Sequence, residues 1–354
     1  MRENKNITVT EIARRLDLSR STIDRVINER GNVAAATKEK VLKYIEKINY
    51  TPNRAARHLA KMTNYTIAIS YYFPRKFAEK INQGIDEIYE ELNHYGLNII
   101  IRAAQSREEQ LAQIKELAEQ VDALILSAWD KPELITLINE LVERGIPVAT
   151  FNRDLPGSNR LFYFGCDYYQ SGRLAGEIIA KMADPGKIAI IGDPEDRIAA
   201  QRITGFKDVL QKLNDFKLIG PWEITQNFNL TASLNKEVVE KVEEISLVNQ
   251  DLTAVFVVNQ TLKAVAEAIN KLGKASQVKI IGYDLYQGTV KLIEADLVQA
   301  VICQQPFNQG YFPLKLLFEM LADQKDIQTE EYITKLEIVM KENLCYYDNY
   351  RGLS

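Results

Sequence analysis

Cysteine and histidine are scarce in this chain of 354 residues. Three cysteines occur, far apart and odd in number, at Cys166, Cys303 and Cys345, and the two histidines are His58 and His94. No Cys-x-x-Cys spacing exists, so neither a zinc site nor a disulfide framework is predicted. Two histidines are also too few for a histidine-rich metal site. We therefore expect no metal and no other cofactor.

Long apolar stretches are also missing. The N-terminal sequence MRENKNITVTEI has no apolar segment of signal-peptide length. No run in the chain approaches the roughly 18 apolar residues of a membrane-spanning helix. We therefore expect a cytoplasmic protein with reduced thiols and no membrane partner.

Charge is unevenly distributed along the chain. With 46% hydrophobic and 26% charged residues it has the composition of a soluble globular protein, and its length exceeds that of an ordinary single domain. The net charge is -4, yet residues 1–61 contain 14 Lys and Arg against 7 Asp and Glu, and the remainder contains 30 against 41. A basic N-terminal segment on an acidic body indicates a polyanionic partner for that segment. For charge alone, a solvated helical face explains the pattern equally well.

The basic segment has the pattern of three short helices. The first is predicted from Thr10, and a turn at Asp17 separates it from a second helix over about residues 20–28, capped by Ser19. A third is predicted from Thr37. Apolar residues at helical spacing supply the inner faces: Ile12, Ala13, Leu16, Ile23, Val26, Ile27, Val41, Ile45 and Ile48. Two short helices joined by a tight turn and supported by a third are typical of helix-turn-helix DNA-binding domains.

The second helix is predicted to read DNA. Arg20 and Ser21 lie on its first turn, which normally faces base edges, and an arginine there pairs with guanine O6 and N7. Thr22, Arg25 and Asn28 are better placed for phosphates or supporting hydrogen bonds. The alternative for each residue is a place on a solvated helix face.

This segment resembles the lactose-repressor family of bacterial regulators. The matching stretches are VTEIARRLDLSRSTIDRVIN, the V-x-x-x-T-K-E-K-V segment from Val33 to Val41, and INYTPNRAARHLA. The resemblance implies a homodimer whose residues after Pro52 form a hinge helix on operator DNA, with Leu59 as a wedge between base pairs in the minor groove. The motif and the resemblance together imply these DNA contacts: Thr10, Ser19, Arg20, Ser21, Thr22, Arg25, Asn28, Asn53, Arg54, Ala56 and Leu59.

Two residues depart from the family pattern. Asp17 stands where the family usually has a turn glycine, but aspartate tolerates left-handed backbone geometry better than most residues. Asp24 replaces a more usual serine within the reading helix. A carboxylate near phosphates is unfavourable, although it can accept a hydrogen bond from cytosine N4 or orient a nearby arginine. The operator sequences of better-known relatives therefore do not transfer to this chain.

After Lys61 the pattern changes to strands alternating with helices. Strands are predicted at 66–70, 97–101, 123–127, 147–151, 188–191, 222–224, 254–258, 278–283 and 298–303, and helices at 77–95, 107–119, 132–144, from 199, from 232 and up to 271. This alternation predicts parallel sheets with helices on both faces, and two doubly wound lobes fit the count better than one very large sheet. In such sheets ligands bind at the carboxyl ends of the strands.

This part is similar to periplasmic sugar-binding proteins of the ribose-binding type. The resembling segments are IPVATFNRDL, FGCDYYQSGRLAGEIIAKM, IGDPEDRIAAQRITGF, AVFVVNQTLKAVAEAINKLG, IIGYDLYQGTV and VQAVICQQPFNQG. Carried over position by position, the implied ligand contacts are Phe77, Asn152, Arg153, Arg202, Phe228, Asn259, Asp284 and Gln304. A carboxylate with fork-shaped arginine donors suits vicinal hydroxyls, and aromatic rings suit the C–H faces of a sugar.

Some of these assignments have alternatives. Asn152 stands where the family often has Asp, which leaves the exact sugar open. Asp284 and Arg153 could form structural ion pairs instead, and Phe77 could belong to the core. Cys166 is expected to be a buried thiol near a lobe crossover. A phosphate on the ligand stays open, because surface solvation also explains the charges of Arg75, Lys76 and Arg197.

The expected fold is therefore α/β, with an all-α helix-turn-helix domain before a two-lobed domain of the periplasmic-binding-protein type. The predicted boundaries are 1–51 for the DNA-binding domain, 52–62 for the hinge, and 63–354 for the effector domain. Lobe 1 is expected at about 63–166 and 305–333, and lobe 2 at about 167–304 and 334–354. The last stretch, CYYDNYRGLS, is predicted as a terminal strand.

Three functions compete for this sequence. The first is a transcriptional regulator, most often a repressor in the resembled family, whose operator affinity is controlled by a sugar, a polyol or a sugar phosphate. The second is a sugar receptor without a DNA role, which the helix-turn-helix segment argues against. The third is a sugar-metabolising enzyme, but the sequence has neither a phosphate-binding G-x-x-x-x-G-K-[ST] loop nor a G-x-S-x-G nucleophile motif. We expect a homodimeric regulator and no enzymatic activity.

Overall fold

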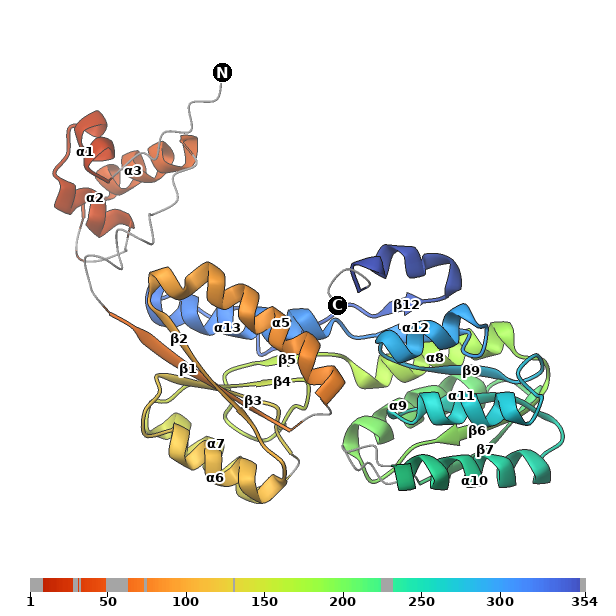
Figure 1. The fold of residues 1–354 in the computed structure, drawn as a ribbon. Helices are drawn as coiled ribbons and strands as arrows, with labels where there is room; N and C mark the ends of the chain where they lie inside the picture. Colours follow the sequence, from red (N-terminus) through yellow and green to blue (C-terminus); the bar gives the residue numbers. More distant parts are fainter. Residues whose placement is uncertain are drawn as a thin grey trace. The chain divides into compact units, whose positions relative to one another are not determined.

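The computed structural model describes residues 9–27, 31, 33–48, 63–72, 75–129, 131–223 and 232–350. The chain divides into two compact units, one of residues 1–64 with 94–96 and one of residues 65–93 with 97–354 (Figure 1). Among the described helices, none combines the length and the apolar character needed to cross a membrane.

The first unit contains the three predicted helices. They are α1 (Val9–Leu16), α2 (Arg20–Ile27) and α3 (Ala35–Lys47). Their shared core consists of Ile12, Ala13, Leu16, Ile23, Val26 and Val41, all from the predicted inner faces. Asp17 adopts a left-handed φ of 54° in the turn, a conformation that aspartate tolerates better than most residues do. Ser19 caps α2, because its Oγ accepts a hydrogen bond from the Thr22 amide at 3.0 Å.

The second unit begins with a parallel sheet, which we call lobe 1 together with its helices. In chain order its elements are β1 (Tyr65–Tyr71), α5 (Arg75–Leu92), β2 (Leu97–Ala103), α6 (Arg107–Leu117), β3 (Ala123–Leu126), α7 (Pro132–Glu143), β4 (Val148–Phe151), β5 (Tyr163–Gly165), α13 (Pro306–Asp323) and β11 (Glu331–Ile333). The short 3-10 helix η1 (Asn93–Tyr95) follows α5, and its last two residues are grouped with the first unit. The strand order is β11-β5-β4-β3-β1-β2. Helices α6 and α7 cover one face, and α5 and α13 cover the other (Figure 1).

The remaining elements form lobe 2. They are α8 (Tyr168–Met182), β6 (Gly186–Ile191), α9 (Arg197–Leu210), β7 (Phe216–Trp222), α10 (Ala232–Val248), β8 (Leu252–Val257), α11 (Leu262–Lys271), β9 (Lys279–Tyr283), α12 (Gln287–Glu294), β10 (Ala300–Cys303), β12 (Glu337–Val339) and the 3-10 helix η2 (Lys341–Tyr350). The strand order is β12-β10-β9-β8-β6-β7, parallel except that β12 runs antiparallel to β10.

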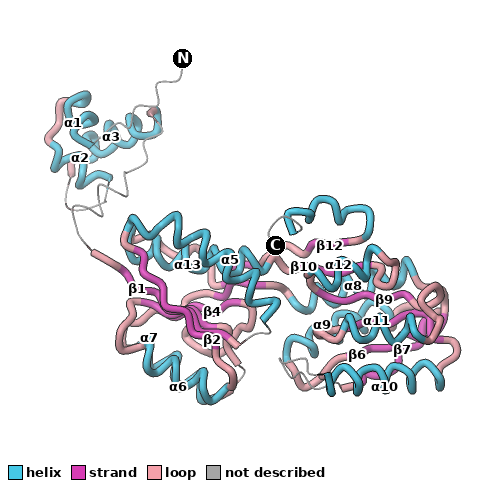
Figure 2. The backbone as a smooth tube through the Cα atoms, viewed as in Figure 1, coloured by secondary structure: helices cyan, strands magenta, loops and turns pink. Residues whose placement is uncertain are grey.

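Lobe 2 is held by two apolar layers. One layer packs α10 and α11 against the sheet, and the other packs α8 and α9 against its opposite face (Figure 2). Helices α8 and α9 touch closely because they meet at glycines. A Cβ on Gly172 would lie 1.9 Å from the carbonyl oxygen of Arg202, and a Cβ on Gly205 would lie 2.0 Å from that of Tyr169. Any larger residue at either position would force the two helices apart.

The chain crosses between the sheets three times. It leaves the sheet of lobe 1 after β5 and returns to lobe 1 after β10 to form α13 and β11. It then crosses again to β12 in lobe 2. Each lobe is therefore assembled from separate stretches of sequence. The fold class predicted from the sequence is confirmed, whereas the exact domain boundaries stay a prediction.

Two sequence predictions were wrong. The strand expected at 222–224 lies earlier, at Phe216–Trp222. Gly220 and Pro221 interrupt its apolar pattern, and a proline is tolerated there because β7 is an edge strand. The terminal strand expected within CYYDNYRGLS is instead part of η2 as far as Tyr350. The hydroxyl of Tyr347 in this helix donates to Glu337 of β12 at 3.4 Å. Beyond these, β5, α8, α12, α13, β11 and β12 were not predicted.

Candidate functional site

Polar side chains gather where the strands of lobe 2 end. Asn259 follows β8, Asp284 follows β9 and Gln304 follows β10, while Arg202 reaches them from α9. Gln304 donates from Nε2 to both carboxylate oxygens of Asp284, at 3.2 and 3.0 Å. These residues were predicted to lie at one edge, because the carboxyl ends of parallel strands meet there, and Gln304 and Asp284 are in direct contact.

Arg202 is buried among aromatic rings in this cluster. Its guanidinium carbon lies 3.5 Å from the ring centre of Tyr283 and 5.1 Å from that of Tyr168. Its Nη1 donates to the carbonyl oxygen of Val258 at 3.0 Å. Cation–π contact and a backbone hydrogen bond thus fix this positive charge at the strand ends.

The electrostatics of the cluster centre on Asp284. Burial raises the pKa of its carboxyl from 3.8 to about 6, while Arg202 and the hydrogen bond from Gln304 act in the opposite direction. Asp284 also holds a left-handed φ of 65°. The ionised carboxylate only accepts hydrogen bonds. A ligand that donates hydrogen bonds to it therefore stabilises the buried charge.

Two polar atoms of the cluster are buried without a hydrogen-bond partner in the described part of the chain. They are Nε of Arg202, a donor, and Oε1 of Gln304, an acceptor. Buried polar atoms in folded proteins nearly always have a partner. One donor and one acceptor at this edge therefore suit a ligand whose groups both donate and accept, as hydroxyls do.

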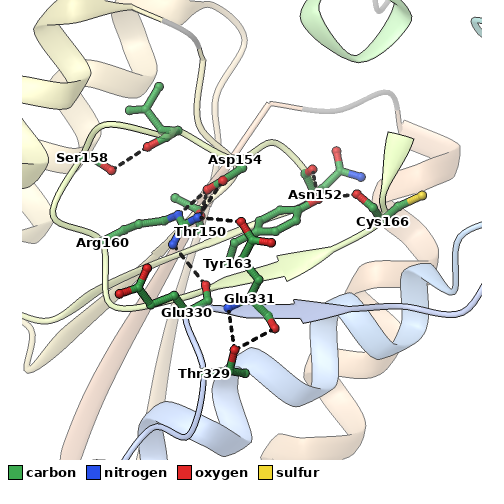
Figure 3. Close-up of polar contacts among 11 residues, drawn as sticks. Thr150, Asn152, Asp154, Ser158, Arg160, Tyr163, Cys166, Thr329, Glu330 and Glu331 are labelled. Carbon is green, nitrogen blue, oxygen red and sulfur yellow. Dashed lines mark hydrogen bonds and ion pairs between the residues drawn. The ribbon is translucent and has the colours of Figure 1, made fainter. Parts of the chain in front are cut away.

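Lobe 1 contributes Asn152, which follows β4. Its Nδ2 donates to Oε1 of Gln309 at 3.2 Å, and Gln309 donates to the carbonyl oxygen of Gln304 at 2.7 Å. The carbonyl oxygen of Asn152 accepts a hydrogen bond from the hydroxyl of Tyr163 (Figure 3). It accepts a second one from the hydroxyl of Tyr168. Gln309 on α13 therefore joins the strand ends of the two lobes.

Arg153 stands beside Asn152 and carries an ion pair. Its Nη2 lies 2.6 Å from Oδ2 of Asp196, immediately before α9. Its guanidinium carbon is also 4.6 Å from the ring centre of Trp129, and that of Arg107 is 4.0 Å from the same ring. A structural ion pair was one of the two roles predicted for Arg153, and the structure contains one.

A cavity of about 230 Å³ adjoins this ion pair. Its walls come from the loops after β3 and β4, the crossover after β5, the start of α9 and strand β11: Ala128, Arg153, Asp154, Pro156, Tyr163, Cys166, Asp167, Tyr168, Arg197, Ile198, Gln201, Glu331 and Ile333. Burial raises the pKa of the Cys166 thiol to about 12, so the thiol stays protonated at neutral pH. Cys166 is thus a buried thiol at a crossover, as expected.

Two further ligand residues were predicted, Phe77 and Phe228. Phe77 is partly buried in the first turn of α5, and its predicted role stays a prediction. Phe228 lies outside the described residues. Four residues of the site were not predicted from the sequence: Trp129, Tyr168, Asp196 and Gln309. Trp129 could have been found, because it follows β3 just as Asn152 follows β4.

The described residues that were predicted to contact DNA lie at the surface of the first unit. Thr10, Ser19, Arg20, Ser21 and Arg25 are exposed, and Thr22 is partly exposed, while the core side of α2 holds Ile23 and Val26. The hydroxyl of Ser19 also lies 2.8 Å from those of Ser21 and Thr22. Asn28, Asn53, Arg54, Ala56 and Leu59 lie outside the described residues. DNA contacts by any of these residues stay predictions.

Comparison with known proteins divides the chain in the same way. Residues 67–325 match the family described as periplasmic binding protein domain, and residues 8–53 match that described as bacterial regulatory proteins, lacI family. The chain is 26% identical to catabolite control protein A of Priestia megaterium over 289 residues, 79% of this chain and 82% of that protein. It is also 26% identical to the HTH-type transcriptional repressor PurR of Vibrio vulnificus (strain CMCP6) over 325 residues, 90% of this chain and 93% of that protein.

A solved structure shares the fold of the larger unit. GanP, a glucose-galactose binding protein from Geobacillus stearothermophilus, aligns with a TM-score of 0.70 at 24% identity, covering 80% of this chain and 99% of that chain. The matches fall on the same two parts of the chain for which the sequence showed resemblances.

Proposed function

This chain belongs to the periplasmic binding protein domain family and carries an N-terminal domain of the lacI family; from that premise we propose that it is a transcriptional regulator, most simply a repressor, controlled by a sugar or sugar-like effector. The observation that carries the proposal is the combination, in one chain, of an exposed reading helix and a polar cluster at the strand ends of a two-lobed domain. Its similarity to catabolite control protein A and PurR supports a regulator rather than a transport receptor.

We assign effector binding to the cluster around Asp284. The ionised carboxylate accepts hydrogen bonds from two neighbouring hydroxyls, and Arg202 and Gln304 donate to or accept from the ligand with their unpartnered atoms. Arg153 and Asn152 approach from lobe 1, and Asn259 completes the lobe 2 side. This donor and acceptor set suits a sugar, a polyol or a sugar phosphate.

We assign operator binding to α2 and to the hinge segment. Arg20 and Ser21 would face base edges in the major groove, with Thr22 and Arg25 on phosphates. A homodimer would place two such helices on a near-palindromic site, with Leu59 of each subunit as a minor-groove wedge. Effector binding would change the spacing of the hinge segments through a coupling of typically about 1–3 kcal/mol. A DNA partner would place the protein in the cytoplasm.

The proposal is tested by selection of duplex DNA with the purified full-length chain. We expect enrichment of a near-palindromic sequence with salt-dependent affinity. A thermal-shift screen of sugars, polyols and sugar phosphates should then find a stabilising effector that alters this affinity. Enrichment of no sequence would reject the regulator and favour a receptor. Turnover of a sugar by the same preparation would favour an enzyme instead.

A further inference from the structure

The ion pair between Arg153 and Asp196 joins the two lobes. Arg153 extends from the loop after β4 in lobe 1, and Asp196 precedes α9 in lobe 2. Their side chains are only 12% and 11% exposed. The other carboxylate oxygen of Asp196, Oδ1, accepts a hydrogen bond from the amide of Ala199 at 3.0 Å and so caps α9. The acceptor is therefore fixed to lobe 2 by the first turn of a helix.

Arg153 has a second support, from its own lobe. The indole of Trp129, which is 8% exposed, lies beneath its guanidinium at 4.6 Å and also contacts Arg107 at 4.0 Å and the ring of Tyr72 at 5.3 Å. The plane of the guanidinium is thus set by an aromatic ring whose own position is fixed by its contacts with Arg107 and Tyr72. A carboxylate from one lobe and an indole from the other leave the guanidinium of Arg153 little freedom.

From this arrangement we infer that Asp196 and Trp129 are positioning residues for Arg153, with Asp196 setting the direction of the guanidinium and Trp129 its plane. The inference rests on the proposed function in that Arg153 is taken as a ligand contact. An effector that binds Arg153 meets a guanidinium that is already paired with Asp196. Asp196 therefore favours neutral groups that accept a hydrogen bond from Arg153 without breaking this ion pair. Hydroxyl groups satisfy this condition.

The chain supplies a matched ion pair for comparison. Asp154 binds Arg160 within lobe 1, with an Oδ2 to Nη2 distance of 2.8 Å and side chains that are 15% and 9% exposed (Figure 3). Arg160 also donates to the carbonyl oxygen of Glu330, and Asp154 accepts from the hydroxyl of Thr150. The two pairs have the same chemistry and nearly the same burial. Only the pair at Asp196 spans the lobes and stands beside Trp129.

The test uses the fluorescence of Trp129 in the full-length chain. The sequence has two tryptophans, so a Trp222→Phe background leaves Trp129 as the only indole. Asp196→Asn removes the charge but keeps an oxygen that can cap α9. In this variant we expect Trp129 emission to shift to longer wavelength and acrylamide quenching to increase, because the released Arg153 uncovers the ring. Asp154→Asn should lower the melting temperature and leave both fluorescence readings unchanged.

A double-mutant cycle supplies the decisive comparison. Arg153→Met should give the same fluorescence change as Asp196→Asn, and the double variant should add nothing, because each change breaks the same ion pair. If Asp196→Asn only lowers the melting temperature and leaves Trp129 emission and quenching as in the parent, Asp196 is a stabilising ion-pair partner and the inference is overturned. Additive changes in the double variant would overturn it too. None of these readings needs DNA or an effector, so failure of the proposed function is seen separately, in the DNA selection.

Discussion

Replacing Asp284 with Asn is expected to stabilise the effector-free protein while removing its response to effector. The carboxyl has a pKa of about 6 in the folded chain against an ordinary value of 3.8. A difference of about two units corresponds to about 3 kcal/mol, since each unit is worth about 1.4 kcal/mol. Because the folded pKa is raised, the ionised form destabilises the fold, and this penalty is fully present above pH 6. It fades as the pH falls through 6 and is gone below about 3.8.

Asparagine imitates the protonated carboxyl at this position. It keeps an oxygen for the hydrogen bond from Gln304, and it tolerates the left-handed φ of 65° about as well as aspartate does. Asp284→Asn should therefore raise the free energy of unfolding by up to about 3 kcal/mol at pH 7.5. The gain should shrink to roughly half at pH 5 and vanish near pH 3.5, if the chain is still folded there.

The measurement is urea unfolding of the full-length chain at several pH values. A Trp129→Phe background leaves Trp222 as the only indole, and this residue packs against the core of lobe 2, so its emission follows the lobe that holds Asp284. Asp154→Asn serves as the control, because it breaks an ion pair and should destabilise. A variant that is no more stable than its parent at pH 7.5, or a gain that persists at low pH, would refute the reasoning. The same variant should still bind selected DNA but lose its effector response.

Three further changes test other parts of the molecule. Arg20→Ala should relax operator preference by about 1–3 kcal/mol per half-site, and an unchanged preference in DNA selection would reject its role in base reading. Leu59→Ala should reduce DNA bending and specific affinity while sparing nonspecific binding, as a gel-shift bending assay would report; an unaltered bend angle would count against the wedge. Gly172→Ala should lower stability by about 1–3 kcal/mol, because its Cβ would lie 1.9 Å from the Arg202 carbonyl oxygen, whereas Gly288→Ala meets only ordinary contacts at 3.6 Å and should be tolerated in the same denaturation assay.

The residues of the site that follow strands can be predicted from the sequence better than those that reach it from other segments. Asn259, Asp284 and Gln304 each follow an apolar strand, and strand ends in a parallel sheet converge whatever the surrounding detail. Trp129 obeys the same rule. Its position just beyond the predicted strand 123–127 does not reveal that its ring lies against Arg153.

Contacts between distant segments could not be predicted in this way. Asp196 and Arg153 are 43 residues apart, and Gln309 is 157 residues from Asn152, so only the folded chain shows that they bind. The close packing of α8 against α9 could not be predicted from their glycines either, although this packing sets the distance between α8 and the backbone of Arg202. The edge strand β7 was misplaced because Gly220 and Pro221 broke its apolar run.

The triple passage of the chain between the sheets has a consequence for its synthesis. Helix α13 and strand β11 complete lobe 1, yet they begin only at residues 306 and 331, after all but the last strand of lobe 2. On the ribosome, lobe 2 can acquire most of its partners while lobe 1 still lacks a covering helix and an edge strand. A nascent chain stalled before residue 306 would expose the face of α5 that α13 covers, and such a product should be a preferred substrate for chaperones and proteases.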